Sequence, residues 1–207
     1  VDGKQHNWSI DIDSGCNFLQ AMSQIQKHLF SLDGVESVSQ AKFNYGTNAA
    51  YSEFDITFED QYIVELGDLQ AIAKTYGSAH SPGDVSVLVP QDRVVLAGDM
   101  AFHIRMPPIF GDTDTALWID SFDRFVDEVA DWIIVPGHGG VTDIATVTEG
   151  TRDYLLFLRA KVQGILEAGG SLDDAYKIDQ SRFQHWHTYD ELAARNAGRV
   201  FERMEFE

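Results

Sequence analysis

Three glycine-containing loops, each placed after a predicted strand, constrain this chain more than any other feature of its sequence. The first loop holds His80, the second holds Asp99 and the third holds His138. Strand ends are where an α/β scaffold can hold side chains rigidly while leaving them open to a ligand. The sequence therefore predicts that these three side chains converge on one cleft at a sheet edge.

The three residue types suit a metal site. Two imidazoles and a carboxylate are a suitable donor set for Zn²⁺ or a similar divalent ion, and the two oxygens of Asp99 could bridge two ions. Taken singly, each loop has a plainer interpretation. A lone histidine is more often a surface or hydrogen-bonded residue, Gly98-Asp99 can be a turn, and Pro136-Gly137 can end a strand. The order and spacing of the three loops together favour the metal site.

The remaining pattern indicates alternating strands and helices. Strands are predicted at residues 9–13, 35–38, 62–66, 69–75, 85–89, 94–97 and 132–135, and helices at 17–32, 115–129, 148–168 and 189–205. The helix at 115–129 has these apolar positions: Leu117, Ile119, Phe122, Phe125, Val126 and Val129. Such alternation predicts an α/β fold. We expect one domain over residues 1–207, with a helical tail from about residue 148.

Composition limits the partners of this chain. It carries 33 acidic and 15 basic residues, a formal net charge of −18. Such a surface repels phosphate, so we expect no nucleic-acid or membrane partner. No apolar run approaches the ~20 residues of a membrane helix. Residues 1–10 do not resemble a signal peptide, and the compartment, cytoplasm or periplasm, stays open.

The loops form one continuous pattern: His80 to Asp84, a strand hairpin, Gly98-Asp99, a helix, a strand, and Pro136 to Gly139. This pattern resembles the C-terminal half of the metallo-β-lactamase superfamily, especially its glyoxalase II-like hydrolases. The resemblance extends from about residue 56 to residue 158. It implies a four-layer αββα sandwich with metal ions at one edge.

The resemblance also implies roles for the three residues. His80 would serve the first metal, Asp99 would bridge both, and His138 would serve the second. The metals, two zinc ions in complete relatives, would supply a hydroxide that attacks an ester, thioester, amide or related bond. The partner we expect is a small-molecule substrate, in keeping with a hydrolase. The best-known zinc β-lactamases have cysteine where this chain has Asp99, which implies a different hydrolytic substrate.

Three further residues are candidates for supporting roles. His103 and Arg105 follow Asp99 closely and are predicted to line the substrate pocket, with a packed loop as the alternative. Asp13 lies in a segment that looks like the early strand and turn of the family. It is expected to brace a metal loop through hydrogen bonds rather than to bind the metal itself.

The strongest signature of the family, His-x-His-x-Asp-His, is missing after the strand predicted at residues 35–38. No histidine occurs between His28 and His80. Each ion would then keep only two protein ligands, whereas tight binding with an activated water needs three. Two interpretations remain. Either the sequence omits a loop that the molecule has, which we favour, or the protein is a degenerate, non-catalytic binding or interaction module.

The first interpretation makes a prediction about mass. If a segment between Val38 and about Tyr51 is omitted, the polypeptide is not continuous there, and the intact natural protein is heavier than 23.1 kDa. Intact-mass spectrometry measures this directly. A mass of 23.1 kDa would instead favour the degenerate interpretation.

Overall fold

The computed structural model describes residues 58–207, of which Asp60–Glu207 form one compact unit. Its framework is a five-stranded sheet with the order β1-β2-β3-β4-β5. The strands are β1 (Gln61–Leu66), β2 (Leu69–Lys74), β3 (Ser86–Val89), β4 (Val94–Phe102) and β5 (Ile133–His138). The first four form an antiparallel meander, and β5 pairs parallel to β4. The hairpin predicted at Gly67-Asp68 is confirmed, because β1 and β2 pair across it.

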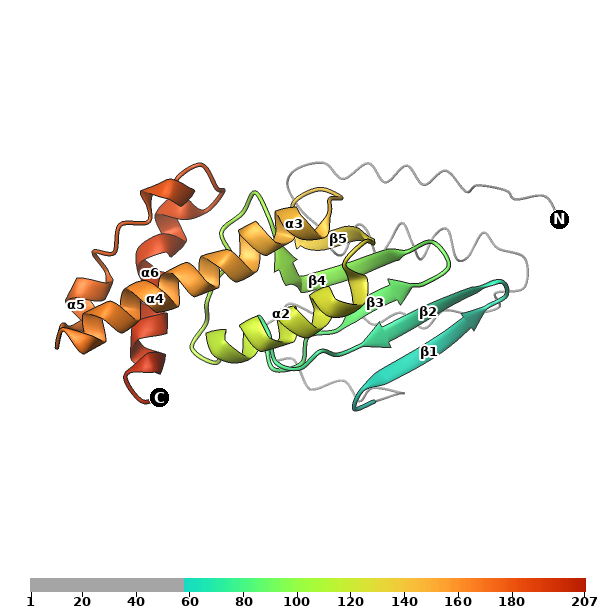
Figure 1. Ribbon diagram of the computed structural model, residues 1–207, viewed down its shortest axis with the longest axis horizontal. Helices are drawn as coiled ribbons and strands as arrows, with labels where there is room; N and C mark the ends of the chain where they lie inside the picture. Colours follow the sequence, from blue (N-terminus) through green and yellow to red (C-terminus); the bar gives the residue numbers. More distant parts are fainter. Residues whose placement is uncertain (1–57) are drawn as a thin grey trace, which may run out of the picture. The chain divides into compact units, whose positions relative to one another are not determined.

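Helices supply the second layer. They are α2 (Thr115–Val129), α3 (Ile144–Val147), the π-helical turn η1 (Thr148–Asp153), α4 (Tyr154–Glu167), α5 (Leu172–Ala175), the 3₁₀ turn η2 (Ser181–Phe183) and α6 (Tyr189–Met204). In Figure 1, α2 lies along the sheet, while α4 extends away from it, with α6 crossing α4 and α5 near its far end. The parallel pairing of β4 with β5 requires a crossover, and α2 provides it.

Several predictions fall on residues outside the described range. These are the elements at 9–13, 17–32 and 35–38, the bracing role of Asp13, and the break after Val38. Within the described range, the α/β class is confirmed by the mixed sheet and its helices.

Helix α2 shows how the sequence fixes the core. Asp114 begins the helix by accepting hydrogen bonds from two backbone amides of the first turn. The fully buried Trp118, Phe122 and Phe125 follow at spacings that put them on one face. The predicted inward position of Leu117 is wrong, since its side chain is 47% exposed. The next residue, Trp118, is the one that is buried, and its Nε1 donates to Met100 O at 3.1 Å.

Both strands that carry candidate ligands are longer than predicted. Strand β4 does not stop at Ala97 but continues through Asp99 to Phe102, and β5 continues through Pro136-Gly137 to His138. Gly98 has φ +58°, and the register of the pair shifts on both sides of it. The extra residue at such a bulge bends the strand and re-aims its side chains without ending the pairing.

The helix predicted at residues 148–168 is interrupted at its start. Residues Thr148–Asp153 form a π-helical turn rather than an α-helix. Thr151 Oγ1 accepts from Phe102 N at 2.8 Å, and Gly150 packs on Phe102 O so closely that a Cβ there would collide with it. The wider π turn thus lets the helix backbone approach the end of β4, an arrangement often found near functional sites.

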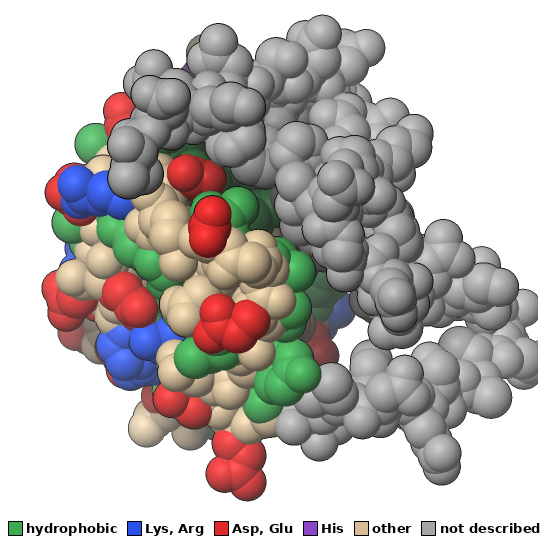
Figure 2. Space-filling view, turned by 90° about the vertical axis from the view of Figure 1, so that its right-hand side faces the viewer, with side chains coloured by type: hydrophobic (Ala, Val, Ile, Leu, Met, Phe, Trp, Pro, Cys, Tyr) green, Lys and Arg blue, Asp and Glu red, His purple; other side chains and the backbone are tan. Residues whose placement is uncertain are grey.

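Acidic side chains are dispersed over the face of the described part that Figure 2 shows. Figure 2 shows Asp and Glu spread among apolar and neutral groups, with few Lys and Arg, on the visible face of the described part. Among residues 58–207, no helix is long and apolar enough to cross a membrane.

The burial pattern of α2 makes a stability prediction. Phe122→Ala removes a fully buried ring and should lower the free energy of unfolding by about 3–5 kcal/mol. The control, Leu117→Ala, changes a half-exposed residue of the same helix and should stay within about 0.5 kcal/mol. Urea denaturation measures both. Equal losses in the two variants would contradict the assigned helix face.

Candidate metal centre

The structure brings the side chains of His80, Asp99 and His138 together. His80 Nε2 lies 3.8 Å from Asp99 Oδ2, and His138 Nε2 lies 3.8 Å from Asp99 Oδ1. Each imidazole therefore faces a different oxygen of the same carboxylate. The three residues come from the β2–β3 loop, from β4 and from the end of β5.

The two 3.8 Å separations fit metal ligands better than direct hydrogen bonds. A hydrogen bond between these atoms needs about 2.7–3.2 Å. Two donors bound to one zinc ion, each about 2.0–2.2 Å from it, lie about 3.3–3.8 Å apart at the angles such ions adopt. The carboxylate is thus spaced to share one ion with each imidazole.

The described residues offer only part of a metal site. Within residues 58–207, no three His, Cys, Asp or Glu side chains are grouped so that they could hold one ion. The geometry agrees with this: each imidazole pairs with one carboxylate oxygen, which gives two donors at each position. Further donors would have to come from outside this set.

His80 is held in an aromatic pocket. Its ring centroid lies 5.1 Å from that of Phe110, 5.5 Å from that of Trp118 and 5.7 Å from that of Phe102. Its side chain is 12% exposed, and its Nδ1 is buried with no hydrogen-bond partner among the described residues. Burying a polar atom without a partner costs free energy, so such an atom marks a site with a role beyond packing.

The backbone around His80 is fixed by short hydrogen bonds. Thr113 Oγ1 donates to His80 O at 2.8 Å, which ties the loop to the start of α2. Asp84 closes the same loop by accepting from Ser81 N at 2.7 Å and from Ser81 Oγ at 3.0 Å. Burial nevertheless raises the pKa of the Asp84 carboxyl above its ordinary value, because desolvation outweighs these bonds.

Asp99 occupies its position because its neighbour in β5 is a glycine. Gly137 lies so close that a Cβ there would overlap Asp99 Oδ1 and would lie 2.8 Å from Gly98 C and O. Pro136 pairs with Gly98 across the two strands. The Pro136-Gly137 pair, which could have been a strand terminator, thus provides the space that the carboxylate needs.

Arg105 contacts His138. Arg105 Nη1 lies 3.0 Å from His138 Nδ1 and 2.7 Å from His138 Nε2. The lone pairs of the two ring nitrogens point away from each other, so a nitrogen this close to both lies over the ring face. Burial lowers the pKa of His138, and the positive charge of Arg105 lowers it further. Both effects keep the imidazole neutral, which is the form that binds metal.

His103 contacts the loop that follows His138. One of its ring nitrogens, Nε2, lies 2.8 Å from Gly140 O, and its backbone N donates to His138 O at 3.1 Å. Gly139, with φ +104°, packs on the His103 ring where a Cβ would collide. The contacts of His103 in this structure brace the His138 loop. Its predicted place in the substrate pocket stays a prediction.

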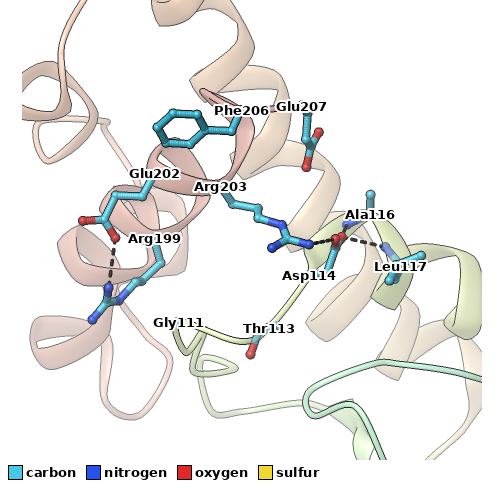
Figure 3. Close-up of a pocket in the computed structure, with 10 residues that line it drawn as sticks. All are labelled: Gly111, Thr113, Asp114, Ala116, Leu117, Arg199, Glu202, Arg203, Phe206 and Glu207. Atoms are coloured by element: carbon cyan, nitrogen blue, oxygen red, sulfur yellow. Dashed lines mark hydrogen bonds and ion pairs between the residues drawn. The ribbon is translucent and has the colours of Figure 1, made fainter.

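A separate cavity of about 450 Å³ lies between the start of α2 and the end of α6 (Figure 3). Its arginines are neutralised: Arg203 Nη2 donates to Asp114 Oδ2 at 2.6 Å, and Arg199 pairs with Glu202. The residues that line it come from outside the three loops. It is therefore distinct from the candidate metal centre.

Sequence reasoning missed the residues that support the site. Thr113, Thr151 and Phe110 have no motif of their own, and their role depends on contacts across 30 to 49 positions of sequence. Trp118 could have been found, because the spacing from Trp118 to Phe122, Phe125 and Val129 follows one helix face.

Comparisons with known proteins give one family. The family model described as the metallo-beta-lactamase superfamily matches residues 14–138. No curated protein matches the chain. Among solved structures, a sec-alkylsulfatase from Pseudomonas sp. aligns with TM-score 0.56 and 16% identity, over 71% of this chain and 26% of its own.

A metallo-beta-lactamase from Pontibacter korlensis aligns with TM-score 0.45 and 22% identity, over 49% of this chain and 48% of its own. The chain thus spans between about a quarter and a half of the length of these two structures. The likeness to the alkylsulfatase supports the fold expected from the sequence.

The close approach of Gly137 to Asp99 makes a prediction. Gly137→Ala should displace the carboxylate and weaken zinc binding at least about 10-fold, the loss seen when a group that orients a ligand is disturbed. The matched control is Gly140→Ala, where a Cβ would meet nothing within 4 Å, and it should bind zinc like the wild type. Zinc titration by calorimetry compares them. Equal affinities would show that Gly137 does not position the carboxylate.

Proposed function

The chain belongs to the metallo-β-lactamase superfamily, and on that premise we propose that it is a zinc-dependent hydrolase of an ester, thioester, amide or related bond. Its substrate in this proposal is a small molecule rather than a nucleic acid or a membrane lipid. The strongly negative charge supports that choice, because it repels polyanions.

The observation that carries the proposal is the placement of Asp99 between two imidazoles. His80 Nε2 and His138 Nε2 each lie 3.8 Å from a different oxygen of its carboxylate. His80 and Asp99 would hold one ion, and His138 and Asp99 would hold the other. When bound, such ions lower the pKa of water to about 7 and polarise a carbonyl oxygen.

Residues around the three ligands would bind the substrate. Arg105 places a positive charge beside His138 and is suited to orient a carbonyl oxygen or a negative group. Phe110 is 42% exposed, and its ring centroid lies 5.1 Å from that of His80, so it offers an apolar surface beside that imidazole. A glyoxalase II-like preference for thioesters is one form of this proposal, and Asp99 in place of cysteine supports it.

A second candidate function is a non-catalytic binding or interaction module. It is favoured by the pairing of each imidazole with a single carboxylate oxygen, which leaves each ion position with two donors among residues 58–207. Metal content of the freshly purified full-length protein separates the candidates. About two zinc ions per chain support the hydrolase, and none supports the module.

The proposal predicts different effects for two nearby substitutions. Asp99→Ala removes the carboxylate that both ions would share, so it should lower zinc-dependent hydrolysis by more than about 100-fold together with zinc content. His103→Ala leaves all three ligands in place but removes a brace of the His138 loop, so it should lower zinc content less than Asp99→Ala does and should change substrate preference more than metal content. Ester hydrolysis and elemental analysis measure both. Full zinc loading and activity in Asp99→Ala would show that the bridge is assigned wrongly.

A further inference from the structure

The loop after β4 forms one wall of the candidate site. It begins at Ile104, carries Arg105 over the His138 ring, and ends at Phe110 against the His80 ring. The wall therefore has a cationic end and an apolar end. Phe110 is 42% exposed although it is a large apolar side chain, so its ring is available to a ligand.

The conformation of this wall is strained. Ile104 has φ +65°, a left-handed backbone angle that a β-branched residue rarely adopts, and its side chain is 48% exposed. Burial of the side chain therefore cannot offset much of the strain. Such a residue persists only where its surroundings hold it, and strained residues cluster at functional sites.

The helical tail supplies those surroundings through two backbone hydrogen bonds. His187 N donates to Ile104 O at 2.8 Å, and Met106 N donates to His187 O at 3.1 Å. The two bonds bracket Arg105, whose backbone forms an isolated parallel bridge with His187. One residue of the tail thus holds the strained turn in place.

Asn196 of α6 holds the other half of the wall. It is completely buried; its Oδ1 accepts from Ile109 N at 2.9 Å, and its Nδ2 donates to Pro107 O at 2.8 Å. The same Nδ2 donates to Tyr154 Oη at 3.0 Å. A buried amide with all of these partners satisfied is costly to replace, and it fixes the loop relative to the tail.

We propose that the helical tail sets the substrate specificity of the site, with Asn196 and the His187 backbone positioning Phe110 to bind an apolar acyl chain of the substrate. The inference rests on the proposed hydrolase function and adds the substrate class. The acyl chain would pack on Phe110 beside His80, at the apolar end of the wall. Burying further methylenes against the ring adds to binding, so longer chains should be preferred.

The test uses zinc-loaded full-length protein and two esters, 4-nitrophenyl acetate and 4-nitrophenyl hexanoate. Asn196→Leu keeps a similar volume but loses both bonds to the loop. Tyr154→Phe is the matched control, because its hydroxyl bonds Gln180 and Asn196, both in the tail, and its loss leaves the loop bonds intact. Hydrogen exchange of residues 104–110 is measured on the same samples.

Wild type and Tyr154→Phe should prefer the hexanoate. In Asn196→Leu, the ratio of kcat/KM for hexanoate to kcat/KM for acetate should fall about 10-fold, because KM for hexanoate rises. A change of this size is expected when a few methylene contacts are lost. Its zinc content and its kcat for acetate should not change, while amide exchange at Ile109 should rise. Phe110→Ala should lose the same preference without the change in exchange at Ile109.

Unchanged exchange over residues 104–110 in Asn196→Leu, or unchanged selectivity, would overturn the inference. If this variant does not fold, Asn196→Ser serves instead, because its shorter side chain cannot reach both Pro107 and Ile109. Failure of the zinc-loaded wild type to hydrolyse either ester counts against the proposed function alone. The exchange measurement still decides whether the tail positions the wall.

Discussion

The parallel pairing of β4 with β5 is the constraint on which the site depends. It sets Gly98-Asp99 beside Pro136-Gly137, and it brings the last residue of β5, His138, level with Phe102. The pairing tolerates the Asp99 carboxylate only because position 137 lacks a side chain. Without this contact between two strand ends, the carboxylate could not face both imidazoles.

The rest of the unit stabilises that strand pair from two sides. Helix α2 covers it through Trp118, which also forms part of the pocket of His80. The π-helical turn reaches the end of β4 through Thr151, and Asn196 extends the support to the loop beyond. These contacts join the sheet, the crossover helix and the helical tail, so the tail is structurally linked to the candidate site.

Much of the fold could be predicted from local patterns. Alternation and turn residues identified β1, β2 and β3 closely, and apolar spacing identified α2. The ends of β4 and β5, at Phe102 and His138, were predicted too early. Glycine and proline usually end strands, whereas here Gly98 forms a bulge and Gly137 permits close packing.

The candidate ligands were also accessible from sequence, because each is a donor side chain in a glycine-containing loop that follows a predicted strand. Their supports were not. The bonds of Asn196 to Pro107 and Ile109 span 89 and 87 positions, and no local pattern encodes such a pair. The strain at Ile104 likewise depends on His187, which lies in a distant segment. Tertiary contacts of this kind appear only once the chain is folded.

The central claim is that His80, Asp99 and His138 bind two ions through a shared carboxylate. Anomalous diffraction at the zinc absorption edge, from crystals of the full-length protein grown with zinc, tests it most directly. The account predicts two peaks about 3.5–4 Å apart, one beside His80 Nε2 and one beside His138 Nε2, with Asp99 between them. The absence of peaks at these residues, or zinc bound without contact to Asp99, would contradict it.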